Sequence, residues 1–194
     1  MNPTVADLTR KIHVLEQELE VQLALARAEL HVRIEDGKVE FEAAVLNRHR
    51  ELKTRLAHYV AGARPLIVIT APVIYALIVP LALLDVFITI YQAVCFPIYG
   101  IARVTRKDYL IFYRRYLAYL NAIEKLNCAY CAYANGLIGY VREIASRTEQ
   151  YWCRIKHARK VAGAHPRYGS FADFGDAQGY RDEVAALAEK ARQE

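Results

Sequence analysis

Apolar residues recur at every eleventh position through the first sixty residues of the chain. Two series are wholly apolar: Leu8, Leu19, Leu30, Phe41 and Leu52, and Ile12, Leu23, Ile34, Val45 and Leu56. Eleven residues make three helical turns at about 3.67 residues per turn, so these positions stay on one face of a nearly straight helix. The pattern predicts a long amphipathic helix in residues 1–62, which would extend roughly 85 Å if it ran unbroken from Thr4 to Ala61.

An apolar stripe of this length needs a covering surface. The stripe can pair with another helix in a coiled coil, or it can lie flat on lipid. The polar face between Asp7 and Glu42 is rich in acids, which anionic lipid would repel. We therefore expect a homo-oligomer, or a bound partner helix, formed through this N-terminal helix.

A second pattern begins at Pro65, where polar residues become rare. From Pro65 to Ala102 the only charged residue is Asp85. Because about 20 apolar residues cross a bilayer, this run is too long for one crossing and suits two. Residues 63–104 are therefore predicted to form a membrane-embedded helical hairpin with its turn near Pro80 to Asp85, and a re-entrant hairpin that does not fully cross is left open.

The charges on either side of this run set the expected orientation. Both flanks are basic, with Arg48, Arg50, Lys53, Arg55 and Arg64 before the run and Arg103, Arg106, Lys107, Arg114 and Arg115 after it. Positive flanks face the cytoplasm. We expect a bacterial inner (cytoplasmic) membrane protein with both termini in the cytoplasm. The net charge of +5 is spread along the chain and does not favour a nucleic-acid partner.

Residues 105–162 carry the candidate chemistry. Cys128 and Cys131 stand three residues apart, and Cys153 and His157 stand four apart. On helices, each spacing places two ligands on one face, and together they make a tetrahedral Cys₃His metal site plausible. The two pairs can meet only if one helix ends near Asn135-Gly136 and the chain turns back, with the capping-box pattern Ser146 to Glu149 starting the return helix.

Zinc suits a closed Cys₃His shell, and iron or an iron–sulfur cluster is the alternative. Glu124 and Glu149 each precede a cysteine by four residues, so they are candidates for orienting the ligands or for ordinary salt bridges. Thiol redox chemistry and cysteines without a ligand remain alternative interpretations of the same residues.

Residues 163–194 read as a polar loop and a short terminal helix, which makes the whole chain all-α. The familiar catalytic motifs are absent from the sequence, so an enzyme is not favoured. The leading hypothesis is a membrane-anchored scaffold or accessory protein with a structural metal site on the cytoplasmic side. The alternatives are a membrane-associated redox or metal-handling protein that uses the same residues, and a membrane-shaping protein.

Overall fold

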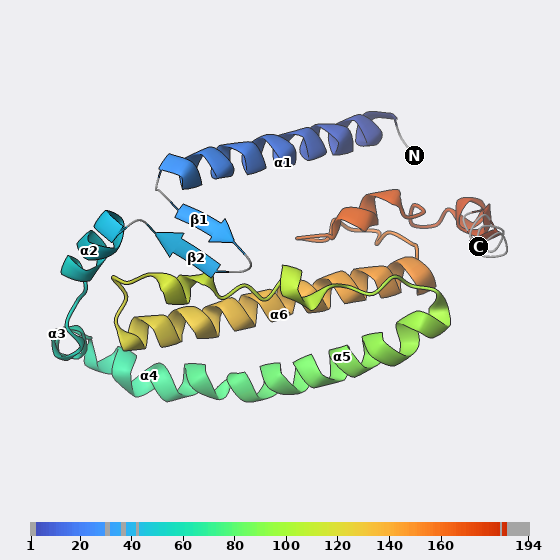
Figure 1. Ribbon diagram of the computed structural model, residues 1–194. Helices are drawn as coiled ribbons and strands as arrows, with labels where there is room; N and C mark the ends of the chain where they lie inside the picture. The colour runs from blue at the N-terminus through green and yellow to red at the C-terminus, as the bar shows by residue number, and fades with distance from the viewer. Residues whose placement is uncertain (1–2, 30–31, 36–37, 42, 183, 186–194) are drawn as a thin grey trace.

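A computed structural model describes residues 3–29, 32–35, 38–41, 43–182 and 184–185 (Figure 1). The described chain is mainly helical, as predicted, with one small β-hairpin. The elements in chain order are α1 (Pro3–Glu29), β1 (Val32–Glu35), β2 (Lys38–Phe41), α2 (Ala43–Glu51), α3 (Leu56–Ala61), α4 (Pro65–Ala76), α5 (Ile78–Tyr99) and α6 (Ala122–Trp152), with 3₁₀ turns at Arg106–Asp108, Tyr113–Tyr116 and Pro166–Ser170.

The predicted single helix over the first sixty residues is wrong. α1 ends at Glu29, and β1 and β2 then pair antiparallel, with Val32 opposite Phe41 and Glu35 opposite Lys38. Both strands alternate apolar and charged residues, which is the period of a strand, and the sequence Asp36-Gly37 between them is favoured in hairpin turns. The eleven-residue series therefore ends with α1 as a helical repeat, and its member Leu30 lies outside the described residues.

The apolar run forms two helices in line, and the predicted hairpin turn is wrong. α4 and α5 are separated only at Leu77, whose N–H bonds to the carbonyl of Ile74 at 3.2 Å. Pro80 stands in the first turn of α5, where a missing N–H costs little, and its ring disfavours a continuous ladder back to Ala76. The expected turn region is thus helical.

Residues 101–121, which we call the return segment, run back along the molecule before α6 begins (Figure 1). As a result α6 lies parallel to α4 and α5. Residues further along α5 contact residues further along α6, as expected for parallel helices. Gln92 Nε2 donates to the Tyr140 hydroxyl at 2.9 Å, and the Tyr99 ring lies 5.2 Å from the Tyr151 ring.

α6 is one helix of 31 residues, so the predicted stop at Asn135-Gly136 and the break at Ser146 are both wrong. Gly136 serves close packing instead, because a Cβ there would lie 2.5 Å from the carbonyl oxygen of Tyr109 in the return segment. Ser146 is buried within the helix, where its hydroxyl donates to the Glu143 carbonyl and accepts from Arg167.

The buried core is small and lies where α5, the return segment and α6 meet. It consists of Phe96, Val104, Leu137, Tyr140 and Ile144. The segment after α6 folds back onto that helix, with Phe171 buried and Ile155 bridged to Ala172. Most of the predicted terminal helix, residues 186–194, lies outside the described residues.

Candidate functional site

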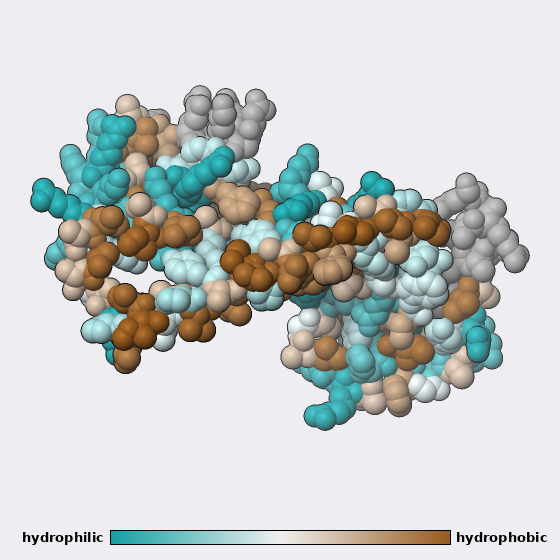
Figure 2. Space-filling model, turned by 90° about the horizontal axis from the view of Figure 1, so that it is seen from below, coloured by the Kyte–Doolittle hydropathy of each residue, from teal (hydrophilic) through white to brown (hydrophobic). Residues whose placement is uncertain are grey.

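The outer face of α4 and α5 is apolar and uncovered. α4 and α5 together make a continuous helical stretch, Pro65–Tyr99. In the described part of the chain, this is the one stretch that is long and apolar enough to cross a membrane. Its 18-residue window of mean hydropathy 2.6 is 0% buried. Exposure reaches 70% at Ile69, 69% at Phe87 and 73% at Ile98. Figure 2 shows the molecule from below, with apolar side chains in an interrupted band across it.

The polar residues of α5 point the opposite way, into the protein. Asp85 and Gln92 are each 7% exposed, while their apolar neighbours Val86 and Phe87 are 56% and 69% exposed. Asp85, Gln92 and Tyr99 are spaced by seven residues, so they share the face that packs on α6. In α5, therefore, polar side chains face the protein and apolar side chains face outward, which is the reverse of a surface helix in a soluble protein.

Asp85 binds the return segment to the middle of α5. One carboxylate oxygen accepts a hydrogen bond from Arg106 Nη2 at 2.6 Å and another from the Tyr133 hydroxyl at 3.0 Å. Burial and the hydrogen bond to this carboxylate raise the pKa of Tyr133. The expectation that Asp85 lies at a hairpin turn is wrong, because it lies within α5 and its charge is paired inside the fold.

Gln92 forms a second attachment, seven residues further along. Its side-chain oxygen accepts from the Val104 N–H at 2.7 Å, and its nitrogen donates to the Val104 carbonyl at 3.3 Å and to the Tyr140 hydroxyl at 2.9 Å. One amide thus joins α5, the return segment and α6. Apart from the seven-residue spacing, no pattern in the sequence indicates this role for Gln92.

The four predicted metal ligands are not brought together within one chain. Cys128 and Cys131 lie on α6, Cys153 directly follows that helix, and His157 lies in the extended segment beyond it. The 22 residues from Cys131 to Cys153 correspond to roughly 33 Å along a helix. All four cysteines of the chain are free thiols, and among the described residues no group of three or more His, Cys, Asp or Glu side chains is placed to hold a metal ion.

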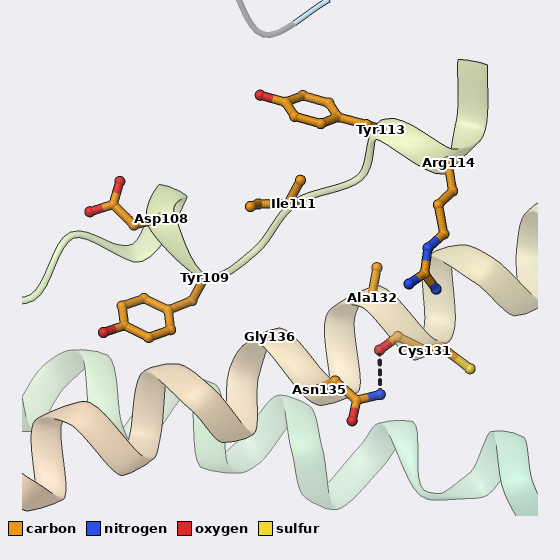
Figure 3. Close-up of a pocket in the computed structure, with 9 residues that line it drawn as sticks. All are labelled: Asp108, Tyr109, Ile111, Tyr113, Arg114, Cys131, Ala132, Asn135 and Gly136. Carbon is orange, nitrogen blue, oxygen red and sulfur yellow. Dashed lines mark hydrogen bonds between the residues drawn. The ribbon is translucent and has the colours of Figure 1, made fainter. Parts of the chain in front are cut away.

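Cys131 lines a shallow cavity of about 610 Å³ between α6 and the return segment (Figure 3). The Arg114 side chain reaches toward α6, whereas Asp108 and Tyr113 point away from it. Asn135 Nδ2 is bonded to the Cys131 carbonyl of its own helix at 2.9 Å. The polar groups of this cavity therefore do not converge on a common point.

The two carboxylates proposed to support the ligands have other partners. Glu124 forms a capping box with Asn121, and this starts α6. Glu149 Oε2 lies 2.9 Å from His165 Nε2, next to the chain segment that folds back on α6. His157 donates its backbone N–H to the Tyr168 hydroxyl at 2.6 Å, and its ring stacks on that of Tyr168.

A half-buried ion pair holds the C-terminal segment against α6. The two terminal nitrogens of Arg167 bind the two carboxylate oxygens of Glu143 at 2.9 and 2.7 Å, and Arg147 Nε binds the same carboxylate at 2.8 Å. The hydrogen bond from Arg167 holds the pKa of Glu143 below its ordinary value. The Glu143 side chain is only 16% exposed.

Comparison with known protein families, with curated proteins and with solved structures gives no match for this chain. The candidate site is the exposed apolar face of α4 and α5 together with the polar contacts behind it.

Proposed function

We propose that this chain is a membrane-associated scaffold or accessory protein that rests on a bilayer through the outer face of α4 and α5, without crossing it. The observation that carries the proposal is the uncovered apolar surface of Pro65–Tyr99, backed by polar residues that point inward. In water, an apolar surface of this extent has to be covered. In lipid, the inward placement of polar side chains is the normal arrangement.

The energy available from such contact is large. Fully burying one Leu, Ile, Val or Phe side chain stabilises by about 1.5–3 kcal/mol. The face carries many largely exposed side chains of this kind, among them Leu66, Ile69, Val73, Phe87 and Ile98. Even partial burial of each would sum to on the order of 10 kcal/mol, which is enough to hold the chain on a membrane.

Helix length and internal charge favour a position in the membrane plane. The 35 residues of α4 and α5 extend about 52 Å at 1.5 Å per residue, whereas a hydrocarbon core is about 30 Å thick. Crossing in this conformation would also carry the Asp85–Arg106 pair and the charged return segment into the hydrocarbon, which is costly. Lying flat, the helix exposes its apolar side to lipid and keeps these charges on the other side.

An in-plane position also accounts for the basic flanks. Arg64 precedes α4 and Arg103 follows α5, so the positive charges stand at opposite ends of one long helix. With the helix in the plane, both ends meet the same leaflet, and basic residues favour the anionic cytoplasmic leaflet. We therefore retain the cytoplasmic face of a membrane, with both termini in the cytoplasm, as the proposed location.

The polar contacts behind the apolar face hold the fold together. Asp85, Gln92 and Glu143 each join one element of the fold to another. A metal ion held by Cys128, Cys131, Cys153 and His157 of one chain would require α6 to break, and the proposed role does not depend on such an ion.

Vesicle flotation tests the proposal. We expect the purified full chain to float with vesicles that contain phosphatidylglycerol, and the double variant Ile69→Glu/Phe87→Glu to lose most of this binding. Ile138→Glu is the matched control, because Ile138 is 56% exposed on α6 rather than on the proposed face. Equal loss in both variants, or full binding by the double variant, would contradict the proposal.

The single tryptophan gives a second readout that needs no substitution. Trp152 is 59% exposed, and its ring lies 5.4 Å from that of Tyr99 at the end of α5. Aromatic side chains of this kind favour the membrane–water interface. We expect its fluorescence to shift to the blue on vesicle addition and to be quenched by lipids brominated near the headgroup.

A further inference from the structure

α1 carries a second apolar surface, separate from the proposed membrane face. Its members are Leu8, Ile12, Leu15, Leu19 and Leu23, exposed by 54%, 56%, 63%, 57% and 43%. At 100° per residue, these five positions fall within an arc of about 80°, so they form one narrow stripe. α1 stands apart from α4, α5 and α6 in Figure 1, and its main neighbour in the described structure is β1.

The charge of α1 is divided along its length. Residues 3–15 hold one acid and two bases, whereas residues 16–29 hold four acids and one base. A parallel pair of such helices would set the two acidic halves side by side. An antiparallel pair would set the basic half of each helix against the acidic half of the other, which is favourable.

We propose that α1 pairs in an antiparallel manner with α1 of a second copy of this chain. The stripe is symmetric in this arrangement: Leu8 faces Leu23 of the partner subunit, Ile12 faces Leu19 of the partner subunit, and Leu15 lies next to the two-fold axis. Lys11 then approaches Glu18 of the partner subunit. Covering the stripe with an identical stripe removes its exposed apolar side chains from water.

This inference goes beyond membrane binding and does not depend on it. The pairing surface is on α1, and the proposed lipid surface is on α4 and α5. Membrane attachment would raise the local concentration of α1 and strengthen the pairing.

Sedimentation of the full chain in mild detergent tests the pairing. We expect a dimer for the natural sequence, and a dissociation constant raised by roughly tenfold or more in Leu19→Glu, because each dimer loses two buried leucines. Val21→Glu is the matched control: Val21 is 58% exposed, compared with 57% for Leu19, and it lies on the opposite face of α1. A monomeric natural chain, or equal effects of the two substitutions, would overturn the proposal.

Cross-linking tests the direction of the helices. In a background with Cys95, Cys128, Cys131 and Cys153 replaced by serine, chains bearing Leu8→Cys are mixed with chains bearing Leu23→Cys. Antiparallel pairing predicts disulfide-linked heterodimers, and little linking when either chain is alone. Linking of the Leu8→Cys chain to itself at full yield would indicate parallel helices and overturn the proposal.

Discussion

Arg106 Nη2 lies 2.6 Å from Asp85 Oδ2, and this contact joins the return segment to the centre of an otherwise apolar helix. The Asp85 side chain is 10% exposed and that of Arg106 is 47% exposed, so the carboxylate is the buried partner. The pair keeps the polar side of α5 covered by protein while its apolar side remains free.

Replacing Asp85 with asparagine should destabilise the fold. Arg106 and Tyr133 would lose their charged acceptor, which costs about 1–3 kcal/mol when a buried hydrogen-bond partner is removed. Denaturant unfolding in detergent measures the change. Asp108→Asn is the control, since Asp108 is an exposed carboxylate of the same return segment. Equal stability of the two variants would count against the contact.

Replacing Gly136 with alanine should loosen the return segment. The added Cβ would stand 2.5 Å from the Tyr109 carbonyl oxygen, so backbone must move, and overpacking of this kind costs about 1–3 kcal/mol. At Gly139 the nearest atom is 3.2 Å away, in the Tyr109 ring, which can shift more easily.

Trypsin cleavage within the return segment measures this effect, with Gly139→Ala as the control for Gly136→Ala. We expect faster cleavage after Arg103, Arg106 and Lys107 in Gly136→Ala than in Gly139→Ala. The reverse order, or no change in either variant, would mean that the close approach at Tyr109 does not limit the packing.

Acid should release the C-terminal segment from α6. The pKa of Glu143 is lowered in the fold, chiefly by its hydrogen bond from Arg167, so the carboxylate contributes stability above its unfolded pKa of about 4.5. That contribution is lost as the pH falls through the lower folded pKa. Amide hydrogen exchange in residues 153–172, corrected for the intrinsic effect of pH and measured from pH 6 to pH 3, should rise in the natural chain. In Glu143→Gln it should already be raised at pH 6, and identical profiles for the two chains would exclude this role for Glu143.

The continuous α6 also predicts how the thiols behave. Because about 33 Å of helix separates Cys131 from Cys153, we expect Cys131→Ser and Cys153→Ser each to change stability by less than about 0.5 kcal/mol. Metal analysis of the purified chain checks the same point. One zinc ion per chain, lost in both variants, would restore the Cys₃His site and require α6 to bend.

Much of the helical character was predictable from the sequence, because the apolar run after Pro65 and the stripe of α1 are local patterns. The contacts that decide the fold are not local. The local pattern predicts a turn at Asp85, because its partner Arg106 lies 21 residues further along the chain. It predicts a helix stop at Gly136, because the Tyr109 backbone that packs where a side chain would stand comes from another segment.

The N-terminal error has a different cause. Val32 to Glu35 alternates apolar and charged residues, so the strand signal was present in the sequence. The eleven-residue spacing passed through Ile34 and Phe41 by coincidence and suggested a helix there. For the cysteine site, each pair has a plausible helical spacing on its own, and only the unbroken course of α6 separates them.

The most direct test of the central claim asks on which side of a membrane the two ends of α4 and α5 lie. Chains with the four native cysteines replaced by serine, and bearing either Arg64→Cys or Ala102→Cys, would be added to sealed vesicles and treated with a membrane-impermeant maleimide. A helix in the membrane plane predicts full labelling at both positions without lysis. Protection of one position until the vesicles are lysed would show that the helix crosses and would contradict the account.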